Sequence, residues 1–369
     1  MIAAACWLAI ALASGCRARS GGADGAEDPP TRRFSFSRIT FDPRGVSPPL
    51  RVRVPPRTRS LAVVVEGDPG ALYGLAALET ADGVDHVAMP PDLHLGAAMR
   101  AAYFEDRSGE MPGALRQSVR LGLFTGIFPD RPGVALPAGE VTVRVATTDP
   151  SHPVRVDLVL AELLDDNDGE VAALPVNLFL VSAAPAPAPP DPRALPFVAR
   201  LRSILAGGGV DLRVERVLAL TDASLATMTE LSEPQEPPTS ASSRLALAGG
   251  ARVDGDALDL FVVDSLPAGV GGWTLGTPGP PLPDTIYSGV IAARLDGGDE
   301  LARVLAHEIG HYLGLWHVQH TSRSGALHAD PLADTAPGTG NLMDEEGRGT
   351  HLTRDQRFVL TRHPLVRLP

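Results

Sequence analysis

The chain has 369 residues, of which 44% are apolar and 21% are charged, and its formal net charge is −12. The apolar content excludes a globally disordered chain, and the negative charge predicts no nucleic-acid partner, because phosphate contacts dominate that kind of affinity. The two cysteines are Cys6 and Cys16, so residues 17–369 hold neither a disulfide framework nor a cysteine-ligated metal. The length allows two domains of ordinary size.

The first segment has the features of an export signal. Residues 2–14 form an apolar run of signal-peptide length, too short for a bilayer span, which takes ~20 apolar residues. Its end, LASGC at 12–16, resembles the lipobox of bacterial lipoproteins, although no Arg or Lys precedes the apolar run. The resemblance implies that residues 1–15 are removed and that Cys16 is lipidated. An ordinary signal peptide cut near residues 13–15 is the alternative.

Localisation follows from this segment. We expect an exported protein of the bacterial cell envelope, held at the outer membrane or cell surface by lipid on Cys16, or a secreted one. Residues 16–33 are polar and rich in Gly and Pro, which predicts a flexible tether between the anchor and a folded body.

Residues 34–182 are predicted to form an all-β sandwich domain. Short apolar runs, mostly of period two, are separated by turn sequences, as expected for antiparallel sheets. The runs lie at 50–55, 60–67, 140–148, 154–164 and 175–183. Their rhythm loosely resembles the β-sandwich accessory domains of secreted bacterial peptidases. The acidic turn at 165–170 lacks EF-hand spacing, so we interpret it as a hairpin turn. The Pro/Ala-rich residues 183–193 are predicted to be an interdomain linker.

Residues 194–369 are predicted to form an α/β (α+β) domain with a twisted sheet. Apolar residues at helical spacing over 197–205 stop at three glycines, and strands are expected at 210–220, 258–266 and 288–295. Asp299 and Glu300 then begin a further helix, where negative charge meets the positive end of the helix dipole.

That helix carries a metal-binding pattern, HEIGHYLGLWH at 307–317. His307 and His311 are four residues apart and so project from one helix face, while Glu308 can reach a water molecule without being a ligand. Gly314 can adopt the positive φ that ends the helix and returns His317 to the same ion. Three nitrogen ligands leave a fourth position for water, which is the arrangement of a catalytic zinc site.

The pattern matches HExxHxxGxxH, the zinc-binding consensus of the metzincin metallopeptidases. On this basis the chain resembles that family. The family has a methionine-containing turn below the metal, and Met343 in NLMD fits that position. The resemblance implies that Met343 forms a hydrophobic floor and that an edge strand near 288–295 binds the substrate. Residues 328–337 and 352–356 are most similar to the pappalysin-like branch. No Tyr follows Met343, so the extra tyrosine of astacin-type sites has no candidate.

Two further features lie near this site. Asp330, Asp334 and Thr335 resemble a family loop that binds structural calcium, and a hydrogen-bonded loop is the alternative. Thr353 and Gln356 have the spacing of a capping box and predict a C-terminal helix that stops before Pro364.

The sequence therefore predicts an exported zinc endopeptidase that hydrolyses peptide bonds in protein or peptide substrates, with Glu308 as general base toward water at the metal. A metallohydrolase of non-peptide substrates is one alternative. Another is a catalytically inactive or non-peptidase lipoprotein whose β-sandwich binds a surface partner. The remaining histidines are not assigned as ligands, and five of them are expected at the surface: His86, His94, His152, His351 and His363.

Overall fold

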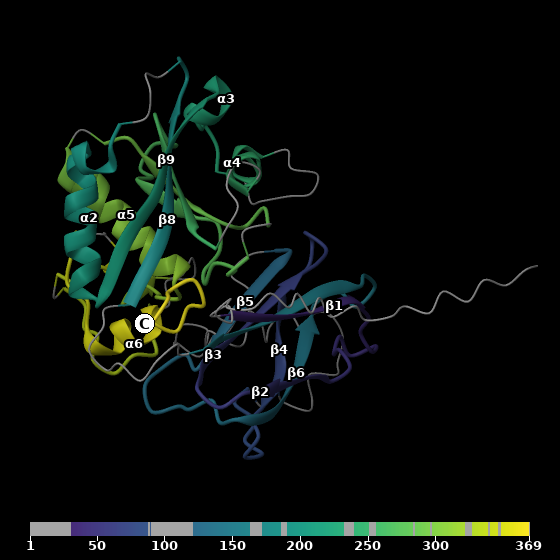
Figure 1. Ribbon diagram of the computed structural model, residues 1–369. Helices are drawn as coiled ribbons and strands as arrows, with labels where there is room; N and C mark the ends of the chain where they lie inside the picture. Colours follow the sequence, from purple (N-terminus) through teal and green to yellow (C-terminus); the bar gives the residue numbers. More distant parts are fainter. Residues whose placement is uncertain are drawn as a thin grey trace, which may run out of the picture.

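The structure is a computed structural model that describes residues 31–87, 89, 121–162, 172–185, 190–231, 240–250, 256–282, 285–295, 297–321, 327–338, 340–345 and 348–368. The signal peptide at 1–15, lipidation of Cys16 and the acidic turn at 165–170 lie outside these residues and stay predictions. Within the described ranges, no helix is both long and apolar enough to cross a bilayer. The fold is mixed α+β and mostly β (Figure 1).

The first half of the chain folds into two antiparallel sheets that share one apolar core. Their orders are β1-β7-β3-β5 and β2-β6-β4. The strands are β1 (Thr31–Ile39), β2 (Leu50–Val54), β3 (Thr58–Glu66), β4 (Tyr73–Glu79), β5 (Leu123–Phe128), β6 (Gly139–Thr147) and β7 (Val154–Glu162). In β2, Leu50, Val52 and Val54 are buried while the two arginines between them are exposed, as the alternation predicts. Buried residues of both sheets form a single cluster.

Four of the predicted runs are confirmed as β2, β3, β6 and β7, whereas β1, β4 and β5 were not predicted. The flexible tether was expected to span residues 16–33, but β1 begins at Thr31. The prediction of a tether is therefore wrong for residues 31–33. There the backbone pairs with β7, from Thr31 opposite Ala161 onward.

The second half contains a five-stranded sheet of order β11-β12-β10-β8-β9. Its strands are β8 (Ala172–Ser182), β9 (Val210–Thr221), β10 (Leu258–Val263), β11 (Gly272–Thr274) and β12 (Val290–Ala293). The pairs among β12, β10, β8 and β9 are parallel, and β11 alone is antiparallel to its neighbour.

Placing β8 in the first domain is therefore a wrong prediction. β8 pairs with β9 and β10, so residues 183–193 connect β8 to a helix of its own unit and do not separate the two units. The physical reason is visible in the sequence: β8 is a nearly continuous apolar run buried on both faces, which is typical of a parallel sheet covered by helices.

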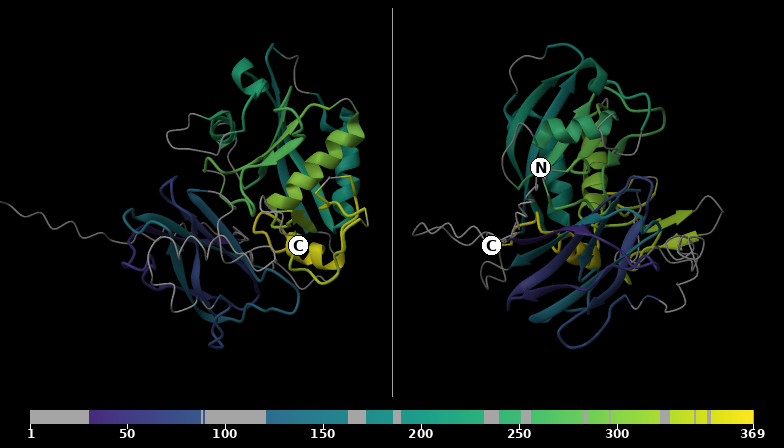
Figure 2. Two further views of the ribbon diagram at one scale, coloured as in Figure 1. Left: turned by 180° about the vertical axis from the view of Figure 1, so that it is seen from behind. Right: turned by 90° about the vertical axis from the view of Figure 1, so that its right-hand side faces the viewer.

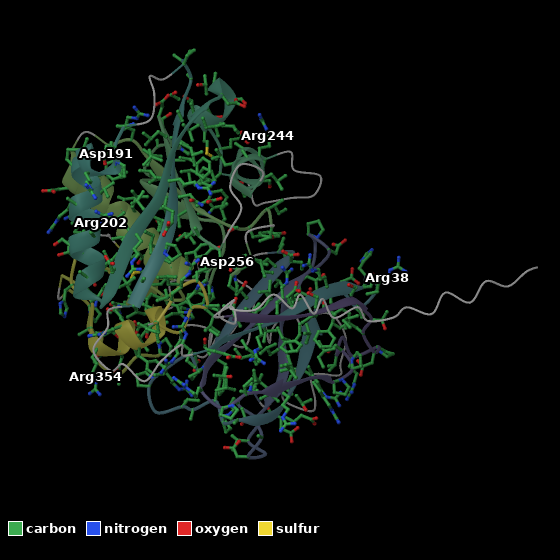
Figure 3. The ribbon with its side chains drawn as sticks, in the orientation of Figure 1. Arg38, Asp191, Arg202, Arg244, Asp256 and Arg354 are labelled. Atoms are coloured by element: carbon green, nitrogen blue, oxygen red, sulfur yellow. The ribbon has the colours of Figure 1, made fainter. Side chains whose placement is uncertain are left out.

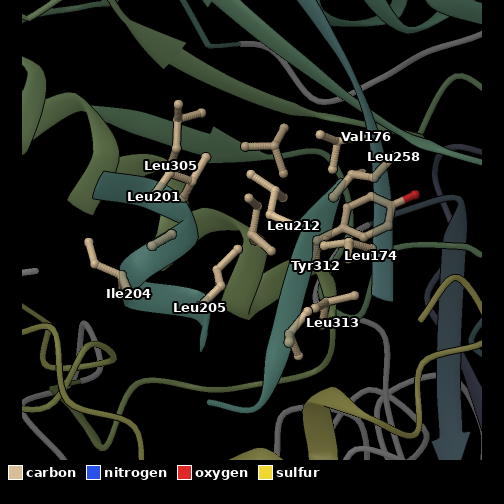
Figure 4. Packing of buried hydrophobic residues seen from close by; sticks show 14 of the residues in the cluster. Leu174, Val176, Leu201, Ile204, Leu205, Leu212, Leu258, Leu305, Tyr312 and Leu313 are labelled. Atoms are coloured by element: carbon tan, nitrogen blue, oxygen red, sulfur yellow. The ribbon is translucent and has the colours of Figure 1, made fainter. Parts of the chain in front are cut away.

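Helices cover both faces of the five-stranded sheet. On one face α2 and α5 pack side by side, and Figure 4 shows Leu201 and Leu205 of α2 near Leu305 of α5 and Leu212 of β9. On the other face α3 and α4, which were not predicted, contribute to a second cluster. The helices are α2 (Pro196–Gly207), α3 (Ala223–Ala226), α4 (Ala241–Gly250), α5 (Gly298–Tyr312) and α6 (Arg354–Leu360). A 3-10 turn, η1 (Pro192–Ala194), precedes α2. A hairpin of β13 (Gln319–Thr321) and β14 (Leu327–Ala329) follows α5.

The edge of the sheet differs from the expectation. β12, expected near 288–295 as the substrate-binding edge, lies between β10 and β11, and β11 is the edge strand on that side of the sheet. This strand has three residues inside a stretch rich in Gly and Pro, so neither its length nor its alternation could reveal it.

The two units meet in an apolar interface. Side chains of β3, β5 and β7, including Val64 and Ile127, cluster with Leu282, Ile286 and Tyr287 of the loop before β12. Figure 2 shows the two bodies in contact from two further directions. By contrast, the exposed residues Arg38 and Arg354, labelled in Figure 3, lie at the outer margin of the molecule in that view.

Polar contacts extend this interface to the C-terminal segment. The buried guanidinium of Arg59 donates to the carbonyls of Val366 and His363, and the hydroxyl of Ser60 donates to the carbonyl of Arg362, with an O···O distance of 2.6 Å. The first unit thus binds the segment that follows α6.

Candidate metal centre

The site is built on α5, which begins at Gly298 with Asp299 and Glu300 in its first turn, as predicted. His307 is buried and His311 is partly buried one turn later on the same face. His317 follows the end of the helix. The structure brings these three imidazoles together, so that all three offer a ring nitrogen to one point.

The three Nε2 atoms form a nearly equilateral triangle. The distances are 3.1 Å between His307 and His311, 3.1 Å between His311 and His317, and 3.2 Å between His307 and His317. Three ligands at ~2.0–2.1 Å from a tetrahedral zinc ion are about 3.3 Å apart, so the triangle fits one zinc ion.

The outer ring nitrogens determine which atoms face inward. His307 Nδ1 lies 2.7 Å from the carbonyl of Leu342, and His311 Nδ1 lies 2.8 Å from the carbonyl of Leu315. A carbonyl only accepts, so each Nδ1 carries the proton and each Nε2 presents its lone pair. Lone pairs converging at about 3.1 Å repel one another unless a cation lies between them, and neutral imidazoles are ligands that zinc prefers.

The turn after α5 supplies one of these carbonyls. Gly314 has a φ of +108°, as its predicted role requires. The N–H of Leu315 donates to the carbonyl of Gly310, and that of Gly314 donates to the carbonyl of His311, which together form a Schellman motif. The same turn brings the Leu315 carbonyl to the His311 ring and returns the chain toward His317.

Met343 lies directly against α5, next to Gly310. It is fully buried, and a Cβ added at Gly310 would lie only 2.6 Å from its sulfur. Its carbonyl accepts the N–H of Val318, the residue after His317, at 3.0 Å. Gly310 in the HEIGH segment is therefore explained by the close approach of Met343 to α5.

The carboxylate of Glu308 is held by β11. The hydroxyl of Thr274 lies 2.7 Å from Glu308 Oε2 and 2.8 Å from the Glu308 carbonyl. A Cβ at Gly272 would lie 2.7 Å from Glu308 Cγ, so a glycine there leaves room for the side chain. The sequence alone did not predict a role for Gly272 or Thr274. The local signal for a strand here is the pair Trp273-Thr274, two residue types that favour strands, next to glycines.

An open cleft of about 530 Å³ exposes the site. The imidazoles and Glu308 lie on its floor. One wall is β11 with the loop before it, and the rest of the lining includes Glu300, Arg303 and Glu345. A cleft of this size bordered by an edge strand can admit an extended chain.

The electrostatic environment keeps His317 neutral. Burial, reinforced by the neighbouring His307, lowers the pKa of His317 to about 4, while the nearby carboxylate of Glu345 acts in the opposite direction. A metal ligand must be an unprotonated imidazole, so this histidine is ready to bind at neutral pH.

The loop with the calcium candidates is organised by hydrogen bonds. Asp330 Oδ1 accepts the hydroxyl of Thr335 at 2.5 Å and the N–H of Leu332 at 3.2 Å. Asp334 instead accepts the N–H of Asp355 in the first turn of α6. Burial raises the pKa of Asp330 to about 6. These contacts support the hydrogen-bonded alternative, and calcium stays a prediction.

The expectation for one histidine is wrong. His363 is fully buried, because the C-terminal segment is covered by the first unit and by the end of α5. Its Nε2 donates to the carbonyl of Gly279 and its Nδ1 accepts the N–H of Leu365. His152 and His351 are exposed as expected, His86 is half-buried, and His94 lies outside the described residues.

Comparisons with known proteins give little sequence similarity. No protein family matches the chain, and no curated protein matches it. Among the solved structures that match, metalloproteinase-II from Bacteroides fragilis aligns with 12% identity and a TM-score of 0.31. The alignment covers 56% of this chain and 62% of that one, which is less than two thirds of its length. The functional argument therefore rests on the geometry of the site.

Proposed function

We propose that the chain is a zinc-dependent endopeptidase of the metzincin type, most like the pappalysin-like branch. The observation that carries the proposal is the triangle of inward-facing Nε2 atoms of His307, His311 and His317 beside Glu308. When bound to three such ligands, zinc lowers the pKa of a water molecule to about 7 and polarises a carbonyl.

The side chains around the metal supply the remaining chemistry. Glu308 accepts a proton from the attacking water and delivers it to the leaving amine, so no covalent intermediate with the protein is required. The Thr274 hydroxyl orients the Glu308 carboxylate through the 2.7 Å hydrogen bond. Gly272 lets this carboxylate lie against the edge strand.

The position of β11 supports a peptide as the substrate. It is one of the two edge strands of its sheet in the described part of the chain and forms one wall of the cleft. A peptide that adds to this edge as a further strand is held in a fixed register above the imidazoles. Under this proposal the two-sheet unit is a β-sandwich accessory domain, and the protein is exported and anchored by lipid on Cys16.

The test uses purified protein from residue 17 onward, with casein and a peptide library as substrates. We expect cleavage that stops with a chelator and returns with zinc. Glu308→Ala should lower kcat/KM by roughly 10²–10⁴-fold, the usual contribution of a general base. Glu300→Gln is the matched control, because Glu300 lines the same cleft but lies two turns from Glu308 on α5, and it should retain near wild-type activity.

Two results would contradict the proposal. One is a zinc-loaded wild-type protein that cleaves no peptide, and the other is a Glu308→Ala variant as active as wild type. The first result would favour the alternative in which the first unit binds a surface partner, and the second would exclude Glu308 as the general base.

A further inference from the structure

Two buried amide side chains bond each other next to the metal centre. Asn341 Nδ2 donates to Gln356 Oε1 at 2.9 Å, and Gln356 Nε2 donates to Asn341 Oδ1 at 3.0 Å. Both residues have no exposed surface. Since each amide both donates and accepts, the pair has a defined orientation that an apolar contact would not impose.

Asn341 transmits this orientation to the methionine turn. Its Oδ1 also accepts the N–H of Met343 at 2.8 Å, which fixes residues 341–343. From this turn the Leu342 carbonyl faces His307 Nδ1, and the Met343 carbonyl accepts the N–H of Val318, next to His317. The turn therefore contacts His307 directly and fixes His317 through its chain neighbour Val318.

Gln356 joins the turn to the start of α6. Its Oε1 accepts the backbone N–H of Thr353 at 3.0 Å, while the Thr353 hydroxyl accepts the N–H of Gln356 at 3.2 Å. This is the predicted capping box, and it is confirmed. The capping box explains the bond from the Thr353 N–H to Gln356 Oε1, but it leaves both bonds between Gln356 and Asn341 without a role in the helix.

We propose that Gln356 is a positioning residue for the metal centre. Through Asn341 it fixes the turn whose carbonyl orients His307, so its loss allows the imidazole to rotate from the inward-facing direction. The inference rests on the proposed metal site. Groups that orient metal ligands typically change metal affinity by ~10–100-fold, and Gln356 acts through one further residue, so an effect of about 10-fold is expected.

The test compares variants that separate the capping role from the positioning role. Gln356→Met removes both hydrogen bonds to Asn341 at similar volume. Gln356→Glu keeps an acceptor for the Thr353 N–H but cannot donate to Asn341. Thr353→Ala is the control, since it weakens the cap and leaves the amide pair intact. The readouts are the zinc dissociation constant by chelator competition, the visible spectrum of the cobalt-substituted protein, and the melting temperature of the metal-free protein.

Both Gln356 variants should bind zinc about 10-fold more weakly and shift the cobalt spectrum. Thr353→Ala should lower the melting temperature with unchanged zinc affinity and spectrum. If Gln356→Met does not fold, Gln356→Glu decides the question. Wild-type zinc affinity in a folded Gln356 variant overturns the inference and leaves the proposed function standing. A wild-type chain that binds no zinc overturns both.

Discussion

At the scale of single residues, the site depends on partners that are not ligands. Backbone carbonyls of Leu342 and Leu315 fix the tautomers of His307 and His311. Glu308 depends in the same way on the hydroxyl of Thr274, which is buried on β11. The reactive atoms are thus oriented from strand β11, from the turn that contains Leu342, and from the end of the 307–317 segment itself.

Replacing Thr274 tests this dependence. Thr274→Val keeps the shape of the side chain and removes the donor to Glu308, so kcat/KM should fall by about 10-fold, as typical for a lost orienting group. Zinc content should remain at about one per chain, because no ligand is altered. Thr274→Ser retains the hydroxyl and should be close to wild type. Equal activity of the Val and wild-type proteins would show that the hydrogen bond has no role in the reaction.

At the scale of elements, the turn that ends α5 positions the candidate metal ligands as much as the helix itself does. Gly314 has a φ of +108°, where a Cβ is strained, and its turn positions both the Leu315 carbonyl and the route to His317. The same few residues end the helix and complete the cluster of three histidines that could hold a metal ion.

Gly314→Ala should lower the free energy of unfolding by more than about 1 kcal/mol, the usual cost of a side chain at positive φ. Zinc affinity should fall with it. Gly207→Ala is the control at the end of α2, where φ is ordinary and a Cβ would meet nothing within 4 Å. Chemical denaturation and chelator competition on both variants provide the measurement. A Gly314 variant as stable as its control would contradict the argument.

The sequence predicted the parts of the site that depend on local spacing. His307, Glu308, His311, Gly314 and His317 are placed by one helix and its end, so 3.6-residue periodicity and turn chemistry suffice.

Contacts distant in sequence could not be predicted in this way. Thr274 and Gly272 meet Glu308 across 34 and 36 positions, and they lie on a strand too short to show a pattern. The assignment of β8 failed for a related reason, because an apolar run does not reveal its pairing partners.

At the scale of the whole molecule, the C-terminal segment joins the two units. Residues 362–366 accept hydrogen bonds from Arg59 and Ser60 of β3, and His363 contacts the ring of Tyr312 at the end of α5. Burial of His363 lowers its pKa to about 4 from the ordinary value of 6.5. The contact between the units therefore contains a group that resists protonation.

The pH dependence of stability follows from this shift. Below pH 6.5 the unfolded chain takes up a proton at His363, and the folded chain does not until about pH 4, so stability is lost across this window as the pH falls. The contribution is up to about 3 kcal/mol. His363→Gln keeps a donor and cannot titrate, so it should lose less stability than wild type between pH 7 and 4.5. Denaturation in the presence of a chelator measures this, and identical pH profiles would refute it.

The order of the chain gives the amide pair of Asn341 and Gln356 a consequence for biosynthesis. Strand β8 begins at residue 172, the central strand β10 begins some 80 positions later, and the Gln356 amide that bonds Asn341 comes after both. A nascent chain that has exposed all three histidines still lacks Gln356, and with it the support of the Leu342 carbonyl. Under the role proposed for Gln356, a chain truncated before α6 should therefore bind zinc more weakly than the full chain.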